Sequence, residues 1–183
     1  MSISKPLEKY LKESKVKYEV VPHKKVFTVY DLAQTLRLKL ETIVKTLLVK
    51  VDQRYVLVVL PAHYRLDFGK LKKILNAKKV DIAREKDMEK FKVKPGAMMP
   101  FGAIHKLDLV ADKSLMKAKE ALFSAGSFTE SVRMKLKDYV RLATPLVADI
   151  GKKFPIKLQV VKKTSKKPHA LGKQKPNGKK KRK

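Results

Sequence analysis

Two apolar runs rich in β-branched residues constrain the fold more than any other feature of the sequence. Residues 45–51 and 54–60 are separated only by Asp52-Gln53. Two such runs joined by two residues are typical of a β-hairpin, although this turn contains no glycine. Pro61 ends the second run, because proline cannot donate a hydrogen bond to a neighbouring strand. We therefore expect an antiparallel strand pair.

Helical and strand patterns are mixed around this hairpin. Residues 95–102 contain two prolines and two glycines, which predicts a loop. Residues 146–161 fit neither pattern. Hairpins mixed with helices favour a single α/β domain with a mixed, mainly antiparallel sheet flanked by helices. We expect helices capped by Ser4 and by Thr28 (with Asp31) and over 67–75, 84–91 and 137–142, and further strands over 16–21, 107–110, 121–125 and 131–136.

The net charge of the chain indicates what the protein binds rather than how it folds. There are 45 Lys and Arg against 17 Asp and Glu, a net charge of +28, which attracts polyanions such as nucleic acid. Residues 162–183 hold 11 of these basic residues and no acid, and they cannot bury enough apolar surface to fold. We predict a domain over 1–157 and a disordered lysine-rich tail over 158–183.

Several classes of protein conflict with the composition. The absence of cysteine excludes disulfides, thiolate zinc sites and a cysteine nucleophile. The four histidines are scattered without ligand spacing, so we expect no metal and no cofactor. No apolar run is long enough to cross a bilayer, and no secretory signal is visible. We expect a soluble cytoplasmic protein without a membrane partner.

A set of short segments occurs in a fixed order along residues 18–143. Each segment alone is a weak signal. The segments are His23 with TVYDLA (28–33), VKTLLV (44–49), YVLVVLP (55–61) with RLD (65–67), the Gly-x-x-x-Pro loop GAMMPFG (96–102) and the turn SAGS (124–127). As an ordered set, they resemble the YbaK/ProX family of aminoacyl-tRNA deacylases, which is related to the editing domain of prolyl-tRNA synthetase.

The resemblance implies hydrolysis of the ester bond between an amino acid and the 3′-terminal ribose of mischarged tRNA. It implies no metal and no Ser-His-Asp arrangement; water is the nucleophile, and the substrate's own ribose hydroxyl helps to activate it. The lysine matching Lys45 binds near the ester and the terminal adenosine, and the Gly-x-x-x-Pro loop shapes the pocket. The partners implied are tRNA and either a synthetase or the ribosome.

The residue types agree with this chemistry. Lys45 lies in an apolar stretch, where a buried charge costs free energy unless an opposite charge or a hydrogen-bond acceptor pairs with it. A phosphate or a developing oxyanion would be such a partner. Glycines let backbone N–H groups approach a ligand closely. We take Lys45 as the catalytic candidate. The substrate-binding candidates are His23, Thr28, Thr46, Gly96, Met98, Met99, Pro100, Gly102, Gly126 and Ser127.

Other interpretations stay open. Lys45 could extend to solvent from a strand end, and the two methionines could be core filler. If Met98 and Met99 line the pocket, they narrow it toward alanine, serine or cysteine. Tail residues Lys179, Lys180, Lys181, Arg182 and Lys183 could bind tRNA or the ribosome, or serve as a localisation signal. The alternative function is a non-catalytic RNA- or ribosome-binding protein that reuses the fold.

Overall fold

The central element is a five-stranded mixed sheet with the strand order β5-β2-β3-β6-β9. The computed structural model describes residues 3–154. Strands β2 (Val44–Val51) and β3 (Arg54–Pro61) form the predicted antiparallel hairpin. β5 (Val80–Ile82) joins β2 in the antiparallel sense, whereas β6 (Asp108–Asp112) and β9 (Leu146–Ala148) add in parallel beyond β3.

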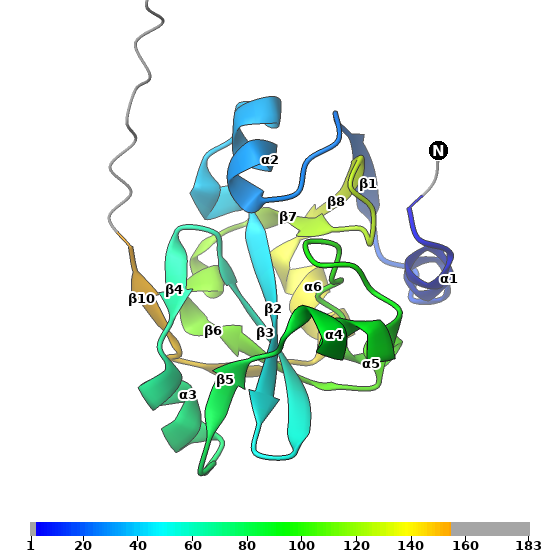
Figure 1. Ribbon diagram of the computed structural model, residues 1–183. Helices are drawn as coiled ribbons and strands as arrows, with labels where there is room; N and C mark the ends of the chain where they lie inside the picture. The colour runs from blue at the N-terminus through cyan, green and yellow to red at the C-terminus, as the bar shows by residue number, and fades with distance from the viewer. Residues whose placement is uncertain (1–2, 155–183) are drawn as a thin grey trace, which may run out of the picture.

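Two smaller antiparallel sheets flank the central one. β1 (Tyr18–Pro22), β8 (Glu130–Lys135) and β7 (Glu120–Ser124) form a three-stranded sheet. A parallel bridge from Ile43 to Leu122 links this sheet to the chain just before β2. β4 (Tyr64–Leu66) pairs with β10 (Gly151–Lys153) on the opposite side of the molecule in Figure 1.

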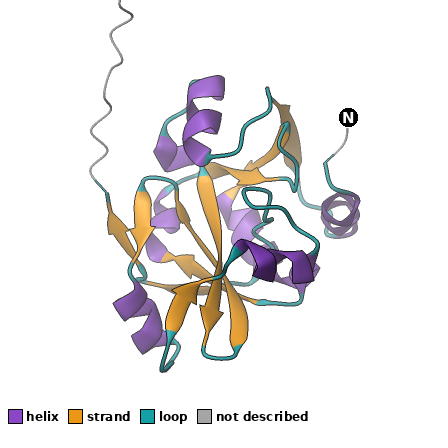
Figure 2. Cartoon of the chain, viewed as in Figure 1, coloured by secondary structure: helices purple, strands orange, loops and turns teal. Residues whose placement is uncertain are grey.

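Short helices surround the sheets (Figure 2). The α-helices are α1 (Lys5–Glu13), α2 (Val29–Leu36), α3 (Phe68–Ile74), α4 (Glu85–Met88), α5 (Gly102–His105) and α6 (Leu136–Ala143). The 3₁₀ turns are η1 (Leu40–Thr42), η2 (Glu89–Phe91) and η3 (Lys113–Lys117). The predicted class, an α/β domain with a mixed, mainly antiparallel sheet flanked by helices, is confirmed. Within residues 3–154 no helix has the length and apolar character needed to span a membrane.

The two predicted helix caps had different outcomes. Thr28 forms the capping box, because its hydroxyl accepts from the Asp31 N–H at 3.1 Å while Asp31 Oδ2 accepts from the Thr28 N–H at 3.2 Å. Ser4 occupies the N-cap position of α1, but its hydroxyl donates to Met99 Sδ at 3.0 Å instead of capping the helix. A tertiary contact therefore replaces the local one.

The hairpin turn works without glycine because aspartate tolerates the left-handed conformation. Asp52 has φ +53°. Its carboxylate accepts hydrogen bonds from the N–H groups of Lys78 and Lys79, at 3.0 Å and 2.8 Å. The turn is thus tied to the segment that leads into β5.

A cluster of aromatic rings holds the 96–102 loop against α6. Tyr139 stacks on Phe123, with ring centroids 4.4 Å apart, and meets Phe101 edge-on at 5.5 Å. The Tyr139 hydroxyl donates to the Pro100 carbonyl at 2.8 Å, and burial raises the pKa of this phenol. Leu7 and Leu11 of α1 are fully buried in the same core. The loop is therefore anchored to the core that α1 and α6 share.

Some predicted segments changed at their boundaries. The expected helix over 84–91 divides into α4 and η2, and the ambiguous segment from 146 contains β9 and β10. The predicted lysine-rich tail over 158–183, with Lys179, Lys180, Lys181, Arg182 and Lys183, lies outside the described residues.

Candidate active site

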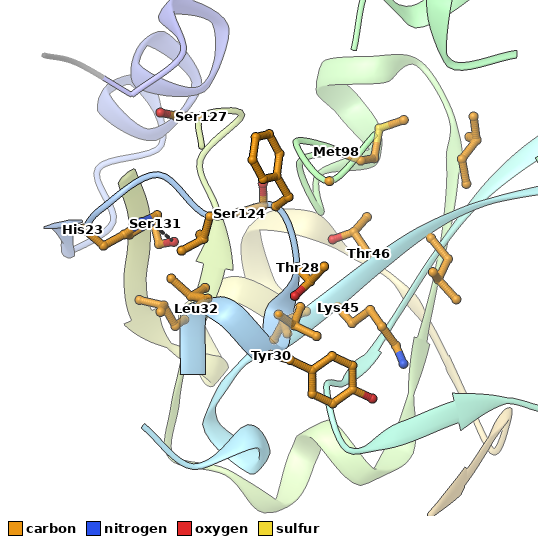
Figure 3. A pocket seen from close by; sticks show the side chains of 18 of the residues that line it. His23, Thr28, Tyr30, Leu32, Lys45, Thr46, Met98, Ser124, Ser127 and Ser131 are labelled. Carbon is orange, nitrogen blue, oxygen red and sulfur yellow. Dashed lines mark hydrogen bonds between the residues drawn. The ribbon is translucent and has the colours of Figure 1, made fainter. Parts of the chain in front are cut away.

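A cavity of about 370 Å³ opens beside the first half of β2. Five segments enclose it: the chain from the end of β1 into α2, β2 itself, the ends of β5 and α4, the start of the 96–102 loop, and the β7–β8 hairpin (Figure 3). Its lining residues are His23, Val26, Phe27, Thr28, Val29, Tyr30, Leu32, Val44, Lys45, Thr46, Leu47, Leu48, Ile82, Met88, Gly96, Met98, Leu122, Ser124, Ser127 and Ser131.

Seven of the candidate residues meet at this cavity: His23, Thr28, Lys45, Thr46, Gly96, Met98 and Ser127. They come from segments far apart in the sequence. Four others, Met99, Pro100, Gly102 and Gly126, are absent from its lining.

Met99, Pro100 and Gly102 are buried and Gly126 is half-buried, and all four pack against other parts of the protein. Met99 Sδ accepts the Ser4 hydroxyl, and a Cβ on Gly126 would lie 2.9 Å from Ser4 Oγ. The Pro100 carbonyl accepts from Tyr139. A Cβ on Gly102 would lie 2.4 Å from the Leu107 carbonyl oxygen. Packing at these four positions requires small or apolar residues. A loop that binds a ligand also contains such residues, so the sequence alone does not distinguish the two roles.

Lys45 is the only Lys, Arg, Asp or Glu that lines the cavity. Its side chain is half-buried, and Nζ donates to the Tyr64 carbonyl oxygen at 2.6 Å. Burial lowers the pKa of Lys45, and the nearby Arg65 charge lowers it further. An ammonium has three N–H donors, so two remain for a ligand. In Figure 3 the side chain runs toward Tyr30, away from Ser127.

The edge of β2 that borders the cavity is open at Thr46. β5 pairs only with Val49–Val51, and the Ala83 N–H donates to the Leu48 carbonyl at 2.9 Å. Because the backbone groups of successive residues alternate in direction, Thr46 presents its N–H and C=O to the same edge as Leu48. No strand within residues 3–154 pairs with that edge at Thr46. The site therefore offers an N–H donor and a C=O acceptor beside Lys45.

The Thr46 hydroxyl is also unpaired. Oγ1 is buried and has no hydrogen-bond partner in the described part of the chain. Figure 3 shows it directed toward the space between Thr28 and Met98. A buried polar group without a partner costs free energy, so it is a natural donor or acceptor for a ligand.

Gly96 brings the loop into contact with the opposite wall of the cavity. It has φ +84°, and a Cβ on it would lie 2.6 Å from the Phe27 carbonyl oxygen. Phe27 in turn packs against Phe128, with ring centroids 5.1 Å apart, and remains 59% exposed at the rim. Glycine is therefore required here both for its backbone conformation and for the close approach.

His23 is fixed by two hydrogen bonds. Its Nδ1 lies 2.9 Å from the Lys24 carbonyl, which can only accept, so Nδ1 carries a proton. Its Nε2 lies 3.0 Å from the hydroxyl of Ser131, which is buried. In the neutral ring, Nε2 accepts from this hydroxyl. The pair forms a polar end to an otherwise largely apolar cavity.

The two remaining hydroxyl candidates are occupied locally. Thr28 Oγ1 donates to Asp31 Oδ2 at 2.8 Å as part of the helix cap. Ser127 Oγ accepts from the Thr129 N–H at 3.1 Å. Neither has a hydrogen bond to histidine in residues 3–154, and no group of three or more metal-ligating side chains occurs there.

Sequence reasoning missed thirteen of the lining residues, among them Phe27, Tyr30, Met88, Leu122, Ser124 and Ser131. Several of them, including Tyr30 and Ser124, lie inside the motifs of the family resemblance. The His23–Ser131 contact spans 108 positions in sequence, and no local pattern announces it.

The model of the aminoacyl-tRNA editing domain matches residues 23–142, which include every residue of the cavity lining. The chain belongs to this family. This editing domain is 33% identical over 129 residues to a proline–tRNA ligase of Fusobacterium nucleatum, covering 68% of the chain and 22% of the ligase. It is 33% identical over 91 residues to that of Macrococcus caseolyticus, covering 49% and 16%. The chain thus spans less than a quarter of these relatives.

Solved structures share the fold of the editing domain. A hypothetical protein superposes with a TM-score of 0.75 at 23% identity, covering 81% of this chain and 100% of the other. A protein described as a candidate trans-editing enzyme for prolyl-tRNA synthetase gives 0.71 at 21% identity, covering 82% and 99%. The shared fold thus covers nearly the whole of both solved chains.

Proposed function

We propose that this editing domain is a trans-editing hydrolase, which cleaves the ester bond of mischarged aminoacyl-tRNA. One observation carries the proposal. Lys45, the unpaired Thr46 hydroxyl and the Gly96 loop share one cavity inside the segment that matches the family. A cation, a free donor and an apolar wall are what an aminoacyl ester requires.

In the proposed reaction, water adds to the ester carbonyl carbon, and the bond between that carbon and the ribose oxygen then breaks. The water proton passes to the departing ribose oxygen, with the neighbouring ribose hydroxyl as the relay. Lys45 Nζ stabilises the negative charge that develops on the substrate, because two of its N–H donors are free of the Tyr64 contact. The Thr46 backbone and hydroxyl orient the ester.

We propose that the cavity selects a small amino acid by size. Met98, Leu122 and Val44 supply apolar wall, and the His23–Ser131 pair supplies one polar end. A volume of about 370 Å³ must also admit part of the terminal nucleoside. Alanine, serine and cysteine fit this description; the polar end favours serine or cysteine over alanine.

The proposed partner is tRNA, with a synthetase or the ribosome as a further partner, and the proposed location is the cytoplasm. The net charge of +28 supports a polyanionic partner. The candidate tRNA-binding residues Lys179 to Lys183 stay a prediction.

The test is a deacylation panel with tRNAs carrying alanine, serine, cysteine and proline. Lys45→Ala should reduce kcat/KM by about 10²–10³, the range for loss of one charge-stabilising donor. Lys50→Ala is the matched control, because Lys50 lies on the same strand outside the cavity lining. If Lys45→Ala and wild-type protein deacylate equally, or if no substrate is cleaved, the proposal is wrong.

A non-catalytic RNA- or ribosome-binding role is the second candidate, and the net charge of +28 favours it. It predicts tight RNA binding with a steep salt dependence that survives Lys45→Ala. The deacylation panel would then show no turnover by any variant.

A further inference from the structure

A second hollow, of about 570 Å³, lies beside the cavity between α2, η1, His63 just before β4, and the end of β10. The two share one lining residue, Tyr30, whose side chain is 46% exposed. Tyr30 therefore stands between them, at the side of the cavity toward which Lys45 runs in Figure 3.

The second hollow has aromatic walls and two lysines. Tyr30, His63 and Phe154 all line it, together with Lys39 and Lys153. The Arg65 guanidinium lies over the Phe154 ring at 3.4 Å, and the His63 ring meets that of Tyr64 edge-on. Nucleobases stack on aromatic faces, and ammonium groups beside these faces bind the phosphates of the same strand.

A lysine cluster continues the surface. A third hollow, of about 560 Å³, shares Lys153 with the second and is also lined by Lys70, Lys113, Lys117 and Lys152. Three of these five lysines are paired. Asp149 bridges Lys70 at 2.7 Å and Lys113 at 2.8 Å, and Asp67 pairs with Lys152. Lys117 and Lys153 form no salt bridge within residues 3–154.

The carboxylates nearby cancel only part of this charge: Asp67 pairs with Lys152 at 2.7 Å, and Glu41 lines the second hollow. Asp112 lines the third hollow, but its carboxylate is already hydrogen-bonded within the protein. It accepts from the Ile150 and Gly151 N–H groups at 2.9 Å and 2.6 Å. The lysines that line the third hollow number five, against two carboxylates, Asp112 and Asp149. An excess of positive charge therefore faces outward.

The lysine cluster connects to the cavity through β4. Tyr64 lines the third hollow, and its carbonyl oxygen holds Lys45 Nζ at 2.6 Å. A strand crossing Tyr30, Phe154 and Lys117 would thus pass the same short strand that orients the catalytic candidate.

We propose that this continuous surface, the aromatic–lysine groove formed by Tyr30, His63, Phe154, Lys153, Lys113 and Lys117, binds the single-stranded 3′ end of an RNA. One base packs against the aromatic walls of the second hollow, and the preceding phosphates lie on the lysines. The inference rests on the proposed function for its direction, because the terminal ester must enter the cavity at Tyr30. An acidic peptide would match the lysines but leave the aromatic walls unused.

The experiment measures binding of two fluorescein-labelled RNA minihelices to the full chain, without an amino acid attached. One ends in an unpaired 3′ CCA, and the other is blunt. The variants are Lys117→Ala/Lys153→Ala and Phe154→Leu. The control is Lys5→Ala/Lys17→Ala, which also removes two charges from exposed lysines, on α1 and just before β1, across the molecule from β10 (Figure 1).

For the RNA with the unpaired end, the association constant falls with salt concentration. Lys117→Ala/Lys153→Ala should make the slope of its logarithm against log salt less steep by about 1.4, and the control should leave this slope unchanged. Phe154→Leu should weaken binding of that RNA by about fivefold to a hundredfold, and should leave the blunt RNA unaffected. Equal effects of all variants on both RNAs, or no effect of the groove variants, would overturn the inference.

This result is separate from the deacylation panel. Groove-dependent binding by a protein that cleaves no ester would support the groove and refute the hydrolase. Deacylation with an unchanged KM in the groove variants would support the hydrolase and refute the groove.

Discussion

Replacing Thr46 with valine should stabilise the protein and impair its activity at the same time. The hydroxyl is buried without a partner in the described residues, and such a group costs about 1–3 kcal/mol. Valine keeps the branched shape and removes the polar atom. We expect the free energy of unfolding to rise by about 1 kcal/mol, which corresponds to about 2–4 °C in Tm for a chain of this size.

The effect on catalysis should have the opposite sign. If the Thr46 hydroxyl donates to the ester in the ground state, its loss removes about 0.5–1.5 kcal/mol, or up to about tenfold in kcat/KM. If it donates to the charge that develops in the transition state, the loss is about 10²–10³ in kcat. Urea denaturation and deacylation of a mischarged tRNA measure the two quantities on the same preparation.

Thr42→Val is the matched control. The Thr42 hydroxyl is exposed, lies outside the cavity lining and donates to the Lys39 carbonyl at 2.8 Å. Its loss should lower stability slightly and leave deacylation unchanged. The reasoning fails if Thr46→Val is destabilising, or if it deacylates as fast as wild-type protein.

Three further predictions concern the walls of the site. Because burial lowers the pKa of Lys45, the unfolded chain binds its proton more tightly, so stability should rise with pH between the lowered pKa and 10.5; Lys45→Met should flatten this part of the urea-derived stability curve. Gly96→Ala should cost about 2–3 kcal/mol, since its Cβ would lie 2.6 Å from the Phe27 carbonyl at φ +84°; an unchanged Tm would contradict this. Tyr139→Phe should cost about 1–3 kcal/mol by leaving the buried Pro100 carbonyl unpaired, which thermal unfolding would detect.

Local patterns were sufficient for some of the structure. The hairpin and the Thr28 capping box depend on residues at most a few positions apart, so their chemistry is visible in the sequence. β4 and β5 were missed because strands of three residues are too short to display a period of two.

The candidate site was predictable only in part, for a tertiary reason. Met98 faces the cavity while its neighbour Met99 meets Ser4, so adjacent identical residues serve opposite sides of one loop. Which of the two methionines lines the cavity depends on where α1 packs. Gly96 and Gly126 likewise share a positive φ but contact different walls, and sequence alone does not separate them.

The open edge of β2 at Thr46 has a consequence for how substrate preference can change. Every aminoacyl ester has the same carbonyl and ribose oxygens, and the open backbone at Thr46 can bind such invariant groups whatever the side chain is. In the proposed complex the variable side chain would meet Met98 and Leu122 instead. Substitutions at those two positions could therefore redirect the domain toward another amino acid without touching the contacts that every substrate shares.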